Sequence, residues 1–215
     1  MAGAGFEPDD VLAFWFPDNG HWEDLESHQA FWTERMQGGM DARILSDFAD
    51  LTEAAATGQL DHWADTPRGR LALLIALDQF PRSLWRDTPA AFAQDIKATR
   101  LALEGIENGD YDRLAPWEQA FFMISISHCE GPDHMQRMEL LDAFTEGIVA
   151  SMPDHLAAMG ERFLAQQARV KGNIARFGRH PHRNPILGRP STPDELAYIA
   201  AGDFPHVRRP ADNAG

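Results

Sequence analysis

The sequence of 215 residues combines 44% hydrophobic residues with 33 acidic and 19 basic side chains, for a net charge of −14 when histidine is neutral. This composition is ordinary for a folded globular protein. It excludes a disordered or collagen-like chain, and the single cysteine excludes a disulfide scaffold. A strongly acidic chain repels phosphate backbones, so we expect no nucleic-acid partner.

Proline-marked helix starts recur along the chain. Proline suits the first helical turn because it lacks an N–H that would be unsatisfied there and its φ is already helical. Thr66-Pro67, Thr88-Pro89 and Thr192-Pro193 each add a capping hydroxyl, and Glu195 completes a capping box with Thr192. Weaker starts are indicated by four further prolines: Pro8, Pro116, Pro132 and Pro153.

Behind these prolines, apolar residues recur every three or four positions, the spacing of one helix face. Stripes over residues 44–55, 92–106 and 156–174 each end shortly before a glycine that can stop the helix. No segment alternates between apolar and polar residues as a strand would. We therefore predict an all-α protein of about seven to nine helices, with boundaries soft by a few residues. Short connections favour antiparallel helix pairs, in a compact multi-helix bundle or in a solenoid.

We expect residues 1–215 to form a single all-helical domain with loose termini at about 1–5 and 205–215. The longest aliphatic run, Leu71–Leu77, is far too short to span a bilayer. The N-terminal residues lack the basic and apolar regions of a signal peptide, and a single cysteine suits a reducing compartment. These features predict a cytoplasmic protein without a membrane partner.

A carboxylate follows the most apolar helix. Residues 71–77 are apolar around the whole circumference, so this helix should be buried. Pro81 should end or kink it one residue earlier, which places Asp78 near the last turn, where the helix dipole disfavours a negative charge. Asp78 therefore needs a cation, and Arg82, Arg86 and the arginines of a later loop are candidates. Such a pair is either part of a functional site or a structural ion pair that holds the helix end.

A histidine closes a second apolar helix. His128 follows residues 121–127 and precedes Gly131-Pro132. A charged histidine is favoured at a helix C-terminus, which is a structural reason for its position, but its pKa near neutrality also suits a general base. Neighbouring residues on a helix do not face each other, so Cys129 is not expected to be a nucleophile activated by His128. The histidines and carboxylates lack the spacing of metal ligands and no glycine-rich nucleotide loop is present, so we expect no metal and no cofactor.

The stretch from Gly178 to Pro190 breaks the helical pattern. It holds three prolines, two histidines and three arginines. A long basic loop near 178–191 of this kind is often functional and can close over a site as a lid. The loop belongs to a basic quarter of the chain, since residues 162–215 hold 9 basic and 4 acidic side chains. This quarter either serves an anionic ligand or packs on the acidic surface of the rest of the chain.

Several segments in the same order resemble the bacterial DUF924 family, whose function is unknown. They are Phe14-Trp15-Phe16, Leu77–Arg82, Ala91–Asp95, His128–Glu130 and Arg176–Asn184. The resemblance implies an all-helical, tetratricopeptide-like fold, a right-handed superhelix of helix pairs, but no activity. It also implies one shared site for the polar residues in these segments: Asp78, Gln79, Arg82, His128, Glu130, Arg179, His182, Arg183 and Asn184. The family pattern has serine at the position of Cys129, which weakens a nucleophilic role further.

Two functions fit these residues, and a third interpretation is purely structural. As a binding protein, the chain would hold a small anionic molecule or a peptide in a concave site lined by Arg82, Arg86, Arg179 and Arg183. As a hydrolase or lyase acting on a small anionic substrate, it would use His128 as the general base, oriented by Glu130 or Asp78. In the structural interpretation, the polar cluster only locks the loop onto the helices. We place binding first because the implied fold offers a concave face, and we leave the oligomeric state open.

Overall fold

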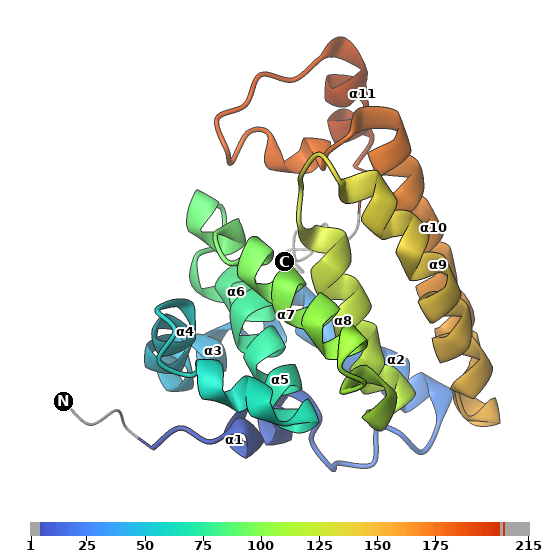
Figure 1. Cartoon of the computed structure of the whole chain (residues 1–215). Coiled ribbons are helices and arrows are strands. Elements are labelled where there is room, and N and C mark those ends of the chain that lie inside the picture. Colours follow the sequence, from blue (N-terminus) through green and yellow to red (C-terminus); the bar gives the residue numbers. More distant parts are fainter. Residues whose placement is uncertain (1–4, 203, 205–215) are drawn as a thin grey trace, which may run out of the picture.

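The elements described in the computed structural model are all helical. The structure describes residues 5–202 and 204, and Figure 1 shows their course. The α-helices are α1 (Pro8–Trp15), α2 (Leu25–Glu34), α3 (Asp41–Asp47), α4 (Ala49–Ala56), α5 (Pro67–Leu74), α6 (Pro81–Leu84), α7 (Asp95–Glu107), α8 (Pro116–His128), α9 (His134–Ser151), α10 (Ala157–Phe177) and α11 (Pro193–Ala201). No strand occurs among these described residues, so the predicted all-α class is confirmed. The tetratricopeptide-like superhelix stays a prediction.

Most of the predicted helix starts are confirmed, because proline lies in the first turn of α1, α5, α8 and α11. The predicted capping box is present: Thr192 Oγ1 accepts from the Glu195 N–H at 3.3 Å, and Glu195 Oε2 accepts from the Thr192 N–H at 2.8 Å. The predicted cap at Thr88 is wrong. Its hydroxyl donates to a backbone carbonyl three residues earlier at 2.7 Å, and Pro89 begins a 3₁₀ turn (Pro89–Phe92) instead of α7.

Helix α5 lies at the centre of the core. Residues 71–77 are at most 1% exposed, and α1, α7 and α8 pack around them, as the all-round apolar sequence predicts. The helix does not end before Pro81. It widens into a π turn (Ile75–Gln79), and the residue before the proline keeps helical angles of φ −62° and ψ −39°. The extra residue in the π turn gives room for the proline ring, which in a regular α-helix clashes with the carbonyl four residues earlier.

Helices α7, α8, α9 and α10 pack in sequence against one another and run in alternating directions (Figure 1). Their short connections favour this antiparallel order. After α10, the chain forms the predicted loop, which contains one short 3₁₀ turn (Pro181–Arg183), and then α11. The loop passes beyond the end of α8 (Figure 1), and Nε2 of His180 in this loop lies 3.1 Å from the carbonyl oxygen of Ser127, the residue before His128.

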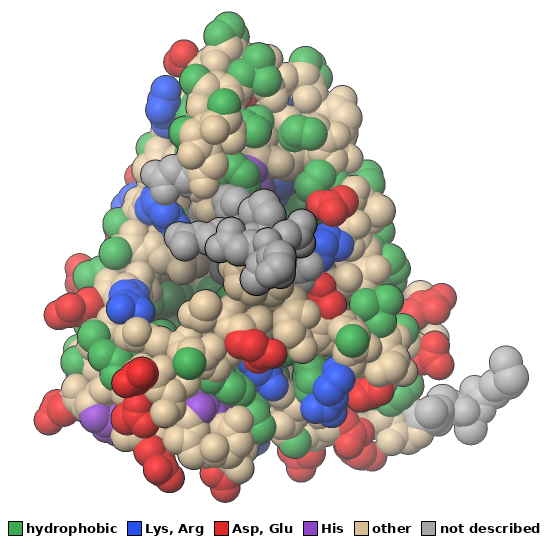
Figure 2. Space-filling view, turned by 180° about the vertical axis from the view of Figure 1, so that it is seen from behind, with side chains coloured by type: hydrophobic (Ala, Val, Ile, Leu, Met, Phe, Trp, Pro, Cys, Tyr) green, Lys and Arg blue, Asp and Glu red, His purple; other side chains and the backbone are tan. Residues whose placement is uncertain are grey.

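The limits of the domain stay a prediction. The loose termini expected at about 1–5 and 205–215 lie outside the described residues, except for Gly5. Among the described helices, none combines the length and the apolar composition that crossing a membrane requires. Figure 2 shows acidic side chains, in red, gathered toward the end of the molecule opposite α11.

Candidate functional site

A cleft of about 390 Å³ lies between the helical core and the basic loop. Six of the predicted site residues line it: Gln79, Arg82, Arg86, His128, His182 and Arg183. Asp78 lies directly behind this wall, hydrogen-bonded to His128. The other three predicted residues, Glu130, Arg179 and Asn184, are not in the wall and belong to the contacts that hold the loop. The structure therefore divides the predicted site into a cleft and a loop anchor.

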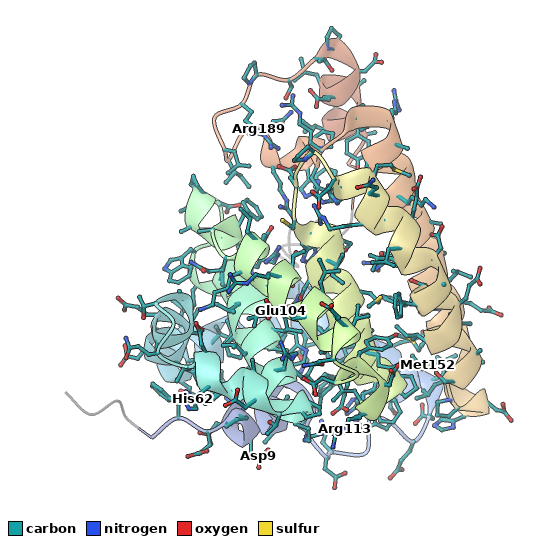
Figure 3. All side chains as sticks on the ribbon, in the orientation of Figure 1. Asp9, His62, Glu104, Arg113, Met152 and Arg189 are labelled. Carbon is teal, nitrogen blue, oxygen red and sulfur yellow. The ribbon has the colours of Figure 1, made fainter. Side chains whose placement is uncertain are left out.

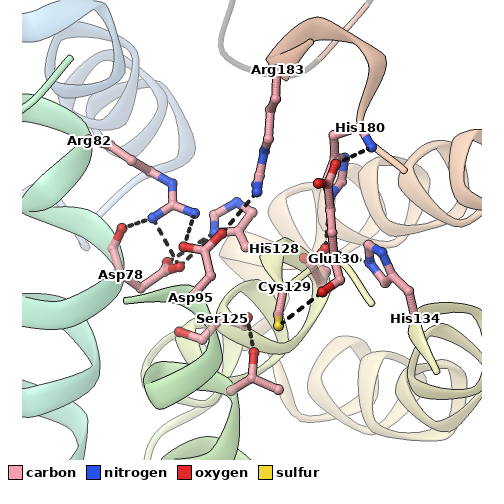
Figure 4. Close-up of polar contacts among 12 residues, drawn as sticks. Asp78, Arg82, Asp95, Ser125, His128, Cys129, Glu130, His134, His180 and Arg183 are labelled. Carbon is pink, nitrogen blue, oxygen red and sulfur yellow. Dashed lines mark hydrogen bonds and ion pairs between the residues drawn. The ribbon is translucent and has the colours of Figure 1, made fainter. Parts of the chain in front are cut away.

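Asp78 and His128 form a buried carboxylate–imidazole pair (Figure 4). The two oxygens of Asp78 lie 2.9 and 3.1 Å from Nδ1 of His128. Burial by itself would raise the pKa of Asp78, but the charge of Arg82 and hydrogen bonds from His128 and Gln79 hold it well below its usual range. The ionised Asp78 accepts a hydrogen bond from Nδ1–H, so the lone pair of the neutral ring is on Nε2. Because His128 lines the cleft, Nε2 is the ring nitrogen available to a bound molecule.

The imidazole of His128 is neutral at physiological pH. Burial and the charge of Arg82 lower its pKa, and the carboxylate of Asp78 opposes them only in part. A neutral imidazole held by a carboxylate is the arrangement that general bases use, since the carboxylate fixes the tautomer and stabilises the protonated ring.

Arg82 and Arg183, which are far apart in the sequence, meet at Asp95 (Figure 4). Nη2 of Arg82 donates to Oδ1 of Asp95, and Nη1 of Arg183 donates to Oδ2, both at 2.9 Å. Arg82 also contacts Asp78, with 3.2 Å between Nη1 and Oδ1. The guanidinium of Arg183 lies over the ring of Phe92, 4.4 Å from its centroid. One carboxylate thus fixes two cations on the cleft wall.

Glu130 anchors the basic loop instead of contacting the His128 ring. It accepts from the N–H of His180 at 2.6 Å and from the guanidinium of Arg189, with Nη2 at 3.2 Å. Nε of Arg189 donates to Oδ1 of the buried Asn184 at 3.0 Å. Figure 3 shows Arg189 on the loop that extends beyond α8. Of the two carboxylates expected to orient His128, the structure brings only Asp78 to the ring.

Arg179 and Arg86 are each paired with a carboxylate. Arg179 donates from Nε and Nη2 to Glu195 of α11 at 2.7 and 2.9 Å, which joins the loop to that helix. Arg86 donates from Nη2 to both oxygens of Asp41 at 2.9 and 3.0 Å in the cleft wall. Both pairs are less than fully buried, so each contributes modestly to stability.

A metal site and a reactive thiol find little support among the described residues. No group of three histidine, cysteine, aspartate or glutamate side chains among them could hold a metal ion. Burial raises the pKa of the Cys129 thiol, whose Sγ donates to the carbonyl of Glu130 at 3.6 Å. His182 lines the cleft with its ring stacked on Phe204, at 4.9 Å between centroids and 6° between planes.

The chain is similar over most of its length to a known protein family. The model of the DUF924 family, described as bacterial protein of unknown function, matches residues 11–203. The chain belongs to the DUF924 family. A solved structure of a protein of unknown function from Agrobacterium tumefaciens, ATU0120, is similar to it, with 29% identity, a TM-score of 0.71 and coverage of 91% of this chain and 97% of that one. No curated protein matches the chain.

Asp95 and Arg189 shape the site of this DUF924 protein but were not predicted from the sequence as site residues. Asp95 is the first residue of α7, where the helix dipole favours a carboxylate, so it has an ordinary structural reason to be there. Its position in the Ala91–Asp95 segment, one of those that resemble the family, was the available signal. Arg189 lies in the basic loop but outside the family-like segments, and only its contact with Glu130 marks it as an anchor.

Proposed function

We propose that this DUF924 protein binds a small anionic molecule in the cleft, as a protein of the cytoplasm. The observation that carries the proposal is the convergence of Arg82 and Arg183 beside His128, through their shared contact with Asp95. Guanidinium groups held in fixed orientation recognise carboxylates and phosphates by paired hydrogen bonds. A peptide would enter such a site through a carboxylate.

Arg183 also retains a donor that needs an acceptor. The residue is 4% exposed, and its Nε finds no hydrogen-bond partner among the described residues. A buried donor without an acceptor costs free energy, more so on a charged group. An anion that binds in the cleft and reaches this nitrogen would supply the acceptor and recover that cost.

Ligand-induced thermal stabilisation and calorimetry test this function. Small carboxylates and inorganic phosphate should raise the melting temperature of the wild-type protein, and binding should weaken at high salt. Arg183→Gln should abolish the effect, and Arg183→Lys should restore it in part because it retains the charge without the planar fork. Arg176→Gln is the matched control, because Arg176 lies on α10 just before the loop, its side chain is 59% exposed and it is outside the cleft. Absence of stabilisation by any of these anions would overturn the proposal.

The Asp78–His128 hydrogen bond supports a second candidate function, a hydrolase or lyase reaction on the same class of anion. In this candidate, Nε2 of His128 takes a proton from a water molecule or from the substrate, and Asp78 stabilises the protonated ring. Arg82 and Arg183 hold the anionic group.

Hydrolysis of p-nitrophenyl phosphate, an anionic ester, gives a first assay of this candidate. His128→Ala should abolish turnover while the far-UV circular dichroism spectrum is unchanged, and His62→Ala, which changes an exposed histidine, should not. The rate should rise with pH with its midpoint below pH 6.5, because burial lowers the pKa of His128 from that value. Persistence of turnover in His128→Ala would exclude His128 as the base.

A further inference from the structure

The cleft contains far more apolar surface than an anion-binding corner requires. Its wall includes apolar and aromatic side chains from α1, the π turn Arg35–Gly39, α8, α10, the basic loop and α11: Trp15, Met36, Ile124, Val170, Ile186 and Tyr198. Ile124 and His128 are four residues apart on α8 and so lie on the same face of the helix. The apolar wall therefore begins directly beside the imidazole.

The charges in and behind the wall are balanced, with four arginines and four aspartates. Four arginines line the cleft: Arg35, Arg82, Arg86 and Arg183. Against them are Asp41 and Asp87 in the wall, and Asp78 and Asp95 bonded to its arginines. A ligand with two or more negative charges would face these carboxylates without enough free cations to offset them. Among anionic ligands, one with a single negative charge disturbs this balance least.

The volume of the cleft leads to the same conclusion. At about 390 Å³ it lies within the range of small-molecule sites. A carboxylate group is the size of one or two water molecules, each of which takes roughly 30 Å³ of liquid volume. Most of the cleft would then be filled by the rest of the ligand, in contact with apolar and aromatic side chains.

We infer that the ligand of this cleft is a monocarboxylate with an apolar or aromatic body, and this inference rests on the proposed anion-binding function. The carboxylate accepts hydrogen bonds from Arg183 and Arg82 beside His128. The body lies along Ile124 and the aromatic side chains of the wall, where burial of its apolar surface supplies affinity that a small polar anion cannot gain.

Isothermal titration calorimetry with a matched series of ligands tests the inference on the wild-type protein. The series consists of 3-phenylpropanoate, its neutral amide, acetate, succinate and inorganic phosphate. We expect 3-phenylpropanoate to bind at least about tenfold more tightly than acetate, succinate or phosphate, which corresponds to about 1.4 kcal/mol. The amide should bind at least about tenfold more weakly than the carboxylate, because it lacks the charge that the arginines recognise.

Two substitutions divide the contributions of charge and apolar surface. Ile124→Thr keeps the β-branch but shortens the side chain and makes it polar, so it should weaken 3-phenylpropanoate and leave acetate unchanged. Arg183→Gln should weaken both. Ile96→Thr is the matched control on α7, because Ile96 is 74% exposed and outside the cleft. If the cleft variants do not fold, the ligand series on the wild type decides by itself.

The possible failures can be told apart. If succinate or phosphate binds as tightly as 3-phenylpropanoate, the monocarboxylate inference is overturned and the anion-binding function stands. If the neutral amide binds as tightly as the carboxylate, the arginines do not recognise the charge, and both fail. If no compound in the series binds, the anion-binding function itself is overturned, and the inference with it.

Discussion

Replacement of Asp78 by asparagine removes one charge at the centre of the polar cluster. Asp78 has no exposed surface and contacts His128, Arg82 and Gln79. Asparagine has nearly the same size, but its amide nitrogen would face donors, and the charge of Arg82 would lose one of its two carboxylate partners. Loss of one partner of a buried ion pair costs about 3–5 kcal/mol. For a chain of this length that corresponds to a fall in melting temperature of about 6–20 °C.

Urea denaturation at neutral pH, with the free energy of unfolding extrapolated to water, measures this loss. Asp194→Asn is the matched control, because Asp194 is 80% exposed and should change stability by less than about 0.5 kcal/mol. A loss below about 1 kcal/mol in Asp78→Asn would refute the view that Asp78 is an ionised, fully paired carboxylate.

The pH dependence adds a second check on Asp78. Because its pKa is lower in the folded than in the unfolded protein, its contribution to stability is present above the unfolded pKa of about 3.9 and is lost as the pH falls below it. The stability difference between wild type and Asp78→Asn should therefore shrink under acidic conditions. The pKa of His128, measured by NMR, should fall further in the variant, since the carboxylate that raises it is gone. A difference that stays constant with pH, or an unchanged His128 pKa, would contradict the assigned pairing.

Three further predictions concern residues outside the cleft: Gly105, His28 and Thr192. Gly105→Ala places a Cβ 2.7 Å from Phe122 Cε1 and should lower the free energy of unfolding by about 1–3 kcal/mol in urea denaturation. Gly147→Ala, in open space on α9, should raise it by up to about 1 kcal/mol. Equal effects of the two substitutions would contradict the close packing around Gly105. Burial lowers the pKa of His28 from 6.5 to about 4, so the unfolded chain binds the proton first and the free energy of unfolding should fall as the pH drops through this window. His28→Gln should flatten this pH dependence in urea titrations, and an unchanged dependence of stability on pH would contradict it. Thr192→Ala removes the α11 cap and should lower the melting temperature by the equivalent of about 1 kcal/mol, while an unchanged melting curve would mean that the capping box does not stabilise the helix.

Part of the candidate site was predictable because its residues are neighbours on one helix or lie at the end of a helix. Asp78 and Arg82 are four residues apart, and their contact follows from a carboxylate that ends a buried helix. The resemblance to the family placed His128 and Arg183 in the same group, and both line the cleft. The same group held Glu130, which contacts the loop, whereas Asp78 contacts the ring of His128.

The sequence by itself determined the helices. Proline starts, glycine stops, the capping box at Thr192 and the all-apolar run at residues 71–77 act through contacts within one or two turns, so they can be read from spacing alone. Only the tertiary structure decided that Asp95 joins Arg82 to Arg183 and that the π turn replaces a helix end before Pro81. These outcomes depend on how α6, α7 and the basic loop pack in space, and an ion pair between distant segments leaves no periodic pattern in the chain.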